Sequence, residues 1–334
     1  MLLKAIRDYY NSFYGSNISV DNIAVFGGGR PAVYATIALL QPDVKVLIEE
    51  TEYTPFWDAL RLLDRKHQLI PSNPDNHFSP TLQDYKNAQA ENEAVFMVKS
   101  NPCNPTGITW SGDKLRDLVE FCSQEGSGGL FDEAYEFFHE PAPVSALKYV
   151  EDINKTNVFV VSAATKGLQA PGLRVGWVVA SKRNIELFRN FSSIAMGGVA
   201  RPSQILTTKL LNVHRVEQAR QAIGQYYGNQ RRRYGEALTA LGFILYTGDG
   251  GFYHWARLPQ GLTADEFNER LFLYKAAILP GTLCDMFRRG NQASPHRHFI
   301  RFSFGPLKES SFDQDIEILR ACLVATPPPT PLNA

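Results

Sequence analysis

The 334-residue sequence has no excess charge of either sign, because 34 lysines and arginines balance 34 aspartates and glutamates. A chain without net charge offers no electrostatic footprint for nucleic acid or an anionic membrane. It has only four cysteines, widely spaced and without a Cys-x-x-Cys pair. No apolar run approaches the roughly 18 residues of a membrane span, and the N-terminus MLLKAIRDYYNSFYG lacks a signal-peptide pattern. These absences favour a cytoplasmic protein that binds neither nucleic acid nor membranes.

The spacing of apolar residues predicts strands that alternate with helices between residues 20 and 180. Such alternation indicates an α/β fold with a mostly parallel sheet. Ligands of such sheets collect at the carboxyl ends of the strands. Strands are expected at 23–26, 45–49, 94–98, 129–132 and 158–161, and helices at 1–15, 32–40, 56–63 and 112–123.

The pattern changes near residue 203, where a long helix over 203–241 is expected, with residues 230–233 as a solvated face. Strands at 243–246, 252–258 and 299–304 and a helix at 263–274 follow. The chain is long enough for two domains. We expect a large α/β domain over 1–202, led by a helix within 1–17, and the long helix with a smaller α+β domain over 203–325. The proline-rich residues 326–334 are expected to be disordered.

Lys166 is the most informative residue, since it follows an apolar run and precedes Arg174 by eight positions in VSAATKGLQAPGLRVGW. Burial disfavours the ammonium form of lysine, and a neutral amine condenses with an aldehyde to a Schiff base. An arginine can hold a phosphate through paired hydrogen bonds. An aldehyde and a phosphate together indicate pyridoxal 5′-phosphate (PLP). By itself, the same pattern also fits a solvated surface lysine.

Other segments supply parts of such a site. The turn GGGR at 27–30 can aim backbone N–H groups at a phosphate, although glycine-rich turns are common. Tyr53 can stack on a flat ring or simply pack. NPCNPTG at 101–107 is a rigid turn that suits a fixed amide, or an ordinary turn. Asp132 ends an apolar strand, where a carboxylate needs a cation such as a protonated pyridine nitrogen, a structural salt bridge or a helix cap.

NPCNPTG, FDEAY, TKGLQAPGLRVGW and FIRFSFG, in this order, resemble the signature set of the class I/II aminotransferases, the fold-type I PLP enzymes. The resemblance implies that Lys166 forms the internal aldimine and that Asp132 pairs with the pyridine nitrogen. It places Asn104 and Tyr135 at the phenolic oxygen and Tyr53 on the ring face. The phosphate would be held by Gly28, Gly29, Arg30, Thr165 and Arg174, and the substrate α-carboxylate by Arg301, with Asn104 beside it.

The sequence departs from this family at two places. Ala163 occupies a position where members usually carry serine, with Ser162 one place earlier, so a phosphate contact is lost or supplied differently, for example by Arg30. Met1 also aligns near a helix that in relatives follows some tens of residues. We therefore expect a chain that lacks a substrate-covering segment, either as a truncated reading of its gene or as a more open site.

The resemblance implies a homodimeric PLP-dependent aminotransferase that moves an amino group between an amino acid and a 2-oxo acid. A lyase or cyclase acting on an amino acid, for instance one forming cyclic arginine-derived amino acids, and a truncated inactive homologue remain alternatives. A PLP-binding regulator is disfavoured, since the sequence contains no DNA-binding segment. The resemblance also implies that Arg201 approaches the cofactor of a neighbouring subunit, with exposure to solvent as the alternative. His296 and His298 can share a strand face, but no third metal ligand is placed, so no metal is expected.

Overall fold

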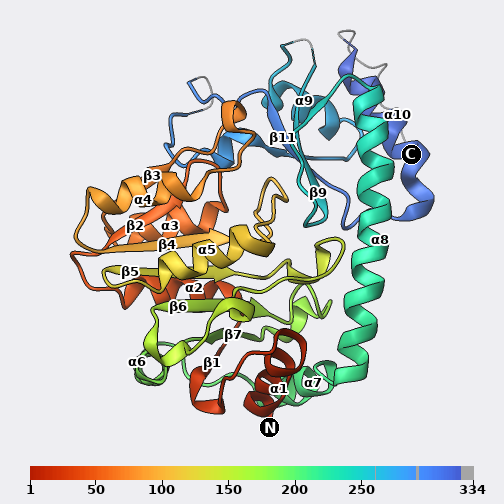
Figure 1. Ribbon diagram of the computed structural model, residues 1–334. Coiled ribbons are helices and arrows are strands. Elements are labelled where there is room, and N and C mark those ends of the chain that lie inside the picture. The colour runs from red at the N-terminus through yellow and green to blue at the C-terminus, as the bar shows by residue number, and fades with distance from the viewer. Residues whose placement is uncertain (260, 291–292, 325–334) are drawn as a thin grey trace.

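A seven-stranded sheet forms the centre of the larger part of the computed structural model, which describes residues 1–259, 261–290 and 293–324 (Figure 1). Its order is β1-β7-β6-β5-β4-β2-β3. Strands β2 to β6 are parallel, while β7 runs antiparallel to β1 and β6. The predicted mostly parallel sheet is confirmed. The strands are β1 (Ile23–Phe26), β2 (Lys45–Glu49), β3 (His67–Ile70), β4 (Val95–Ser100), β5 (Ser127–Asp132), β6 (Val158–Ala163) and β7 (Gly176–Val179).

Helices cover both faces of this sheet. Helices α2 (Gly29–Ala38), α3 (Thr54–Leu62) and α6 (Lys182–Ala195) pack on one face. Helices α1 (Leu2–Tyr14), α4 (Leu82–Ala90) and α5 (Gly112–Cys122) pack on the other. In β6, Val158 and Val160 contribute to one core, whereas Phe159 and Val161 contribute to the other. Burial on both faces explains why this strand is a continuous apolar run in the sequence.

A second, antiparallel sheet of order β10-β11-β9-β8 forms the smaller part of the molecule. Its strands are β8 (Ile244–Leu245), β9 (Tyr253–Arg257), β10 (Leu279–Pro280) and β11 (Phe299–Ser303). Helices α9 (Ala264–Phe272) and α10 (Phe312–Leu323) bury their apolar residues in the same core as this sheet. The expected α+β arrangement is therefore present. The tail prediction for residues 326–334 lies outside the described residues.

The single long helix predicted over 203–241 is wrong. The segment forms α7 (Arg201–Leu210) and α8 (Val213–Ala240), and the latter runs along one side of the molecule to the small sheet (Figure 1). Asn212 separates them because its backbone is extended, with ψ at 133°. Asparagine tolerates this position well, since its short polar side chain favours helix starts over helix interiors.

The solvated face predicted for residues 230–233 is also wrong, because Arg231 is buried in α8. Its guanidinium donates hydrogen bonds to the carbonyls of Phe138 (2.8 Å) and Gly251 (2.7 Å) and pairs with Glu140 at 3.2 Å. Successive helical residues point about 100° apart, so four consecutive side chains cannot share one face. Arg231 thus links the long helix to loops of both parts of the molecule.

The other predicted elements are confirmed with boundaries shifted by a few residues. The largest shift concerns α2, which begins at Gly29 rather than Ala32 and so includes part of the glycine-rich turn. Strands β3, β7 and β10 and helices α4, α6 and α10 were not predicted. None of the helices in the described part of the chain combines the length and apolar character that a membrane span needs.

Candidate active site

The predicted site residues follow strands that end at one edge of the large sheet. Asn104 lies beyond β4, Asp132 is the last residue of β5 and Lys166 lies beyond β6, and these three strands are parallel. Strand β1, which leads to Gly28, has the same direction as β6 because both are antiparallel to β7. The carboxyl ends of all four strands therefore meet at one edge, as expected for a ligand site of an α/β sheet.

Lys166 lies half-buried in a tight turn, where its carbonyl accepts a hydrogen bond from the N–H of Gln169 at 2.9 Å. Its Nζ lies 5.0 Å from the ring centroid of Phe252 and 5.6 Å from that of Tyr135. Among the described residues it has no hydrogen-bond acceptor or carboxylate partner. Burial, followed by the positive charges of Arg301 and Arg30, lowers the pKa of Lys166. The lysine is thus poised to supply a neutral, nucleophilic amine.

Asp132 is a buried carboxylate without a cation. Its Oδ1 accepts the N–H of Ala134 at 3.0 Å, and no described lysine, arginine or histidine forms an ion pair with it. Burial raises the pKa of Asp132 to about 6, although the hydrogen bond from Ala134 opposes this rise. A buried acid in this state gains free energy from any cationic group that binds beside it. The structural salt bridge that the sequence also allowed for Asp132 is not formed within the described ranges.

Asn104 is held where the two sheets meet. Arg301, on β11, donates a hydrogen bond from Nη1 to Oδ1 of Asn104 at 2.7 Å, while its Nε is buried without a partner in the described structure. The turn before Asn104 is braced by Asn101, whose side chain bonds both the N–H and the carbonyl of Trp110 at 2.7 and 3.0 Å. The turn ends at Gly107, where φ is +71° and a Cβ would meet the carbonyl oxygen of Gly250 at 2.4 Å. This bracing fixes the amide, as the rigid sequence predicted.

Two tyrosines approach the same region. The hydroxyl of Tyr53, which precedes α3, accepts a hydrogen bond from Nε of Arg30 at 2.7 Å. Tyr135 packs edge-on against Phe252 and Tyr253, each with ring centroids 5.3 Å away. Burial raises the pKa of Tyr135, so its phenol stays protonated at neutral pH and can donate a hydrogen bond.

A cradle suited to an anion forms at the start of α2. Gly28 has a φ of +122°, and a Cβ there would lie 2.6 Å from Nη2 of Arg174. A Cβ at Gly176 would lie 2.3 Å from the carbonyl carbon of Gly28, so glycine is required on both sides of this contact. The guanidinium of Arg174 therefore lies beside backbone N–H groups that a helix start leaves unpaired. Thr165, the residue directly before Lys166, is half-buried.

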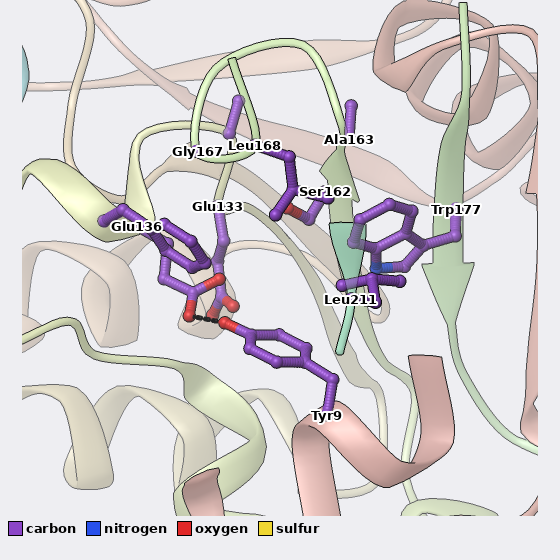
Figure 2. A pocket seen from close by; sticks show the side chains of 11 residues that line it. Tyr9, Glu133, Glu136, Ser162, Ala163, Gly167, Leu168, Trp177 and Leu211 are labelled. Carbon is purple, nitrogen blue, oxygen red and sulfur yellow. Dashed lines mark hydrogen bonds between the residues drawn. The ribbon is translucent and has the colours of Figure 1, made fainter. Parts of the chain in front are cut away.

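Ala163 and Ser162 lie on opposite faces of β6. An ideal Cβ on Gly29 would be 3.7 Å from Cβ of Ala163, so Ala163 is directed toward the cradle. Ser162 lines a small cavity with Trp177, beneath the turn that contains Gly167, and Ala163 borders the same cavity (Figure 2). Adjacent strand residues point to opposite faces, so the hydroxyl of Ser162 does not replace the missing serine. The exposed guanidinium of Arg30, at the first turn of α2, remains as a substitute.

The sequence analysis missed an acidic cluster in this cavity. Glu136 accepts hydrogen bonds from Tyr9 and Tyr14 and pairs with Arg220 at 3.1 Å, while Oε2 of Glu133 is buried without a partner in the described residues (Figure 2). Burial raises the pKa of both glutamates. The run of acidic residues directly after an apolar strand was the available signal. The cluster ties α1 and α8 to the segment that follows Asp132.

The two histidines considered as metal ligands do not share a strand face, because both precede β11. Nε2 of His296 contacts the hydroxyl of Thr51 at 2.9 Å, and Nδ1 of His298 contacts the carbonyl of Leu262 at 3.0 Å. Within the described ranges, no group of three or more histidine, cysteine, aspartate and glutamate residues is arranged to hold a metal ion. Arg201, the first residue of α7, is exposed in the single chain.

Comparison with known proteins places this geometry among PLP enzymes. Residues 1–311 match the family described as aminotransferase class I and II. The chain is 24% identical over 315 residues to an aspartate aminotransferase of Pyrococcus horikoshii, covering 92% of this chain and 77% of that protein. It is 27% identical to an LL-diaminopimelate aminotransferase of Azobacteroides pseudotrichonymphae, covering 93% and 77%. The solved aspartate aminotransferase of Thermus thermophilus with maleate has the same fold, with a TM-score of 0.84, 21% identity, and coverage of 96% and 81%.

Proposed function

Because the chain belongs to the class I and II aminotransferase family, whose members act through PLP, we propose that Lys166 is the residue that binds this cofactor covalently. The enzyme is a PLP-dependent aminotransferase acting on amino acids and 2-oxo acids. The assignment rests on one observation. Lys166 is half-buried and has no acid partner in the described structure, so burial lowers its pKa, and the charges of Arg301 and Arg30 lower this pKa further.

The residues of this site fit PLP. The buried carboxylate of Asp132 lacks a cation, and the protonated ring nitrogen of PLP would supply one. The cradle of Gly28 and Gly29 beside Arg174 presents a helix start and a guanidinium to a phosphate. Arg30 and Thr165 extend the donor set for that phosphate in this proposal.

When bound, PLP withdraws electrons from the amino acid and so acidifies its Cα–H bond. Asp132 would keep the ring nitrogen protonated, and Tyr135 and Asn104 would donate hydrogen bonds to the ring's phenolic oxygen. Tyr53, held by Arg30, would cover the ring face. With the substrate amine bound in its place, the Nζ of Lys166 would be free to accept the proton from Cα and to deliver it to C4′ of the cofactor.

Arg301 is the proposed anchor of the substrate's α-carboxylate. Its Nη1 bonds Asn104, and among the described residues its Nη2 has no hydrogen-bond acceptor, so part of the guanidinium remains available. A guanidinium binds a carboxylate with paired hydrogen bonds, which restricts rotation of the substrate. This restriction would set which bond of Cα lies perpendicular to the cofactor ring. The α-carboxylate is common to all candidate amino acids, so Arg301 serves each of them.

We also propose a homodimer, supported by exposed apolar residues near Arg201. Ile194 is 89% exposed, and Met196, Ile205 and Leu206 are also exposed at the end of α6 and on α7. Exposed apolar surface on a folded chain is typical of an interface when it is contiguous. Arg201 lies between these residues in sequence and would face the partner in this proposal. The four thiols, all in the described part and all free, support a cytoplasmic location.

We also propose two domains with the bounds expected from the sequence, residues 1–202 and 203–325.

The test of Lys166 is replacement by alanine, with arginine as a charge-retaining variant. The wild-type chain should acquire the visible absorbance of lysine-bound PLP, and borohydride followed by mass spectrometry should place the cofactor on Lys166. Both variants should lose this absorbance and turnover. Retention of covalent cofactor in Lys166→Ala would reject the assignment. A single turnover with a panel of amino acids separates transamination from elimination or cyclisation, because only transamination leaves the cofactor in its amine form.

A further inference from the structure

Glu52 is a fully buried acid at the carboxyl end of β2, and no part of the chemistry above uses it. Its Oε2 accepts the N–H of Tyr53 at 2.5 Å, and its Oε1 accepts the N–H of Ser100 at 2.7 Å. The hydroxyl of Ser100 lies 2.9 and 2.8 Å from the two oxygens. One carboxyl group thus holds together the ends of two neighbouring strands.

The contact continues to the backbone of Asn104, whose side-chain amide belongs to the site. Oγ of Ser100 accepts the N–H of Asn104 at 2.9 Å, and Oδ1 of Asn104 accepts the hydrogen bond from Arg301. A continuous hydrogen-bonded chain therefore runs from the backbone of Tyr53 through Glu52 and Ser100 to Asn104. Its two ends are the residues assigned to the face and to the phenolic oxygen of the cofactor ring.

Stability alone does not account for this acid. The nearby cation, Lys99, forms its buried ion pair with Glu49 rather than with Glu52. Burial, and then the charge of Glu49, raise the pKa of Glu52 to about 8, although Lys99 opposes this. A buried acid without an ion pair contributes little to folding compared with an apolar residue of the same size. Its contribution lies in the geometry that it imposes.

We propose that Glu52, acting through Ser100, is a positioning residue that sets Tyr53 and Asn104 at the separation the cofactor ring requires. This inference rests on the proposed function, because it takes Tyr53 and Asn104 to be ring contacts. It adds a role for two residues that never touch the cofactor. The arrangement transmits any change at Glu52 both to the face of the ring and to its phenolic oxygen.

The test compares Glu52→Gln and Ser100→Ala with the control Thr207→Val, which removes a fully buried hydroxyl that bonds only the carbonyl of Ser203 in its own helix. PLP dissociation constants, thermal midpoints and the visible circular dichroism of the bound cofactor are measured for each. Each test variant should weaken PLP binding about tenfold, as expected for one buried hydrogen bond, and should change the dichroism. The control should lower only the thermal midpoint.

A double-mutant cycle then addresses the link itself. Asn104→Ala should weaken PLP binding clearly less in the Ser100→Ala background than in the wild-type chain, since the amide is already misplaced there. Three outcomes would each overturn the proposal. They are losses of PLP affinity that simply multiply in the double variant, dissociation constants of the test variants within twofold of the wild-type value, and failure of both test variants to fold. If the wild-type chain does not bind PLP at Lys166, the proposed function fails instead, and the variants need not be compared.

Discussion

Replacement of Asp132 by asparagine should raise the free energy of unfolding of the PLP-free protein. In the presence of PLP the variant should be less stable than the wild type, because it binds the cofactor more weakly. Burial raises the pKa of this carboxyl from 3.8 to about 6. At about 1.36 kcal/mol per pKa unit, this shift corresponds to roughly 3 kcal/mol of destabilisation once the group is ionised in the folded protein. The amide also brings donors that lack partners, at a cost of about 1–3 kcal/mol. We therefore expect a net gain of up to about 2 kcal/mol at pH 8.

The pH dependence has a definite sign. Between pH 3.8 and about 6 the folded protein retains the proton on Asp132 that the unfolded chain releases. The contribution of Asp132 to the free energy of unfolding therefore falls as the pH rises through this window, and this loss is complete above pH 6. Asp132→Asn removes this dependence, so the gain of the variant should grow from pH 4 to pH 7 and then level off.

Urea denaturation of the PLP-free chain at several pH values measures these differences. Asp43→Asn, at an exposed residue, is the matched control and should behave like the wild type at every pH. In the presence of PLP the order should reverse, because only the carboxylate pairs with the cationic ring nitrogen. An Asp132→Asn variant whose advantage does not change with pH, or one that binds PLP as tightly as the wild type, would refute the reasoning.

Three further outcomes are expected. Gly28→Ala should weaken PLP binding at least tenfold, because the φ of +122° and the nearby guanidinium of Arg174 exclude a side chain. The control Gly27→Ala should leave the PLP dissociation constant unchanged, because a Cβ there meets nothing within 4 Å. Arg301→Lys should raise KM for amino acid substrates about 10- to 100-fold in steady-state assays, since lysine cannot form the paired carboxylate contact. Arg220→Ala should lower the free energy of unfolding by about 3–5 kcal/mol, because Glu136 loses its buried partner, and an unchanged urea midpoint would contradict this.

Local patterns predicted the position of this strand but not which face each of its last residues occupies. The apolar run before Lys166 predicted β6, whose carboxyl end lies two residues beyond the expected Val161, because a strand buried on both faces is apolar along its length. The same run does not reveal that Ser162 is directed away from the cradle while Ala163 is directed toward it. The burial of Arg231 escaped the analysis for a related reason, since its partners are carbonyls in loops far along the chain.

The sequence by itself indicated the family, five of the seven strands of the large sheet and the residues that follow them. Lys166, Asp132 and Asn104 could be named because each lies next to an element whose short-range pattern is distinctive. Only the tertiary structure brought Arg301 to Asn104 across 197 positions, and only it joined Tyr53 to Asn104 through Glu52 and Ser100. Contacts of this kind depend on strand pairing and packing, which arise from the whole fold rather than from neighbouring residues. The chemistry of the site follows from the residue types, whereas the relative positions of Tyr53, Asn104 and Arg301 follow from these distant contacts.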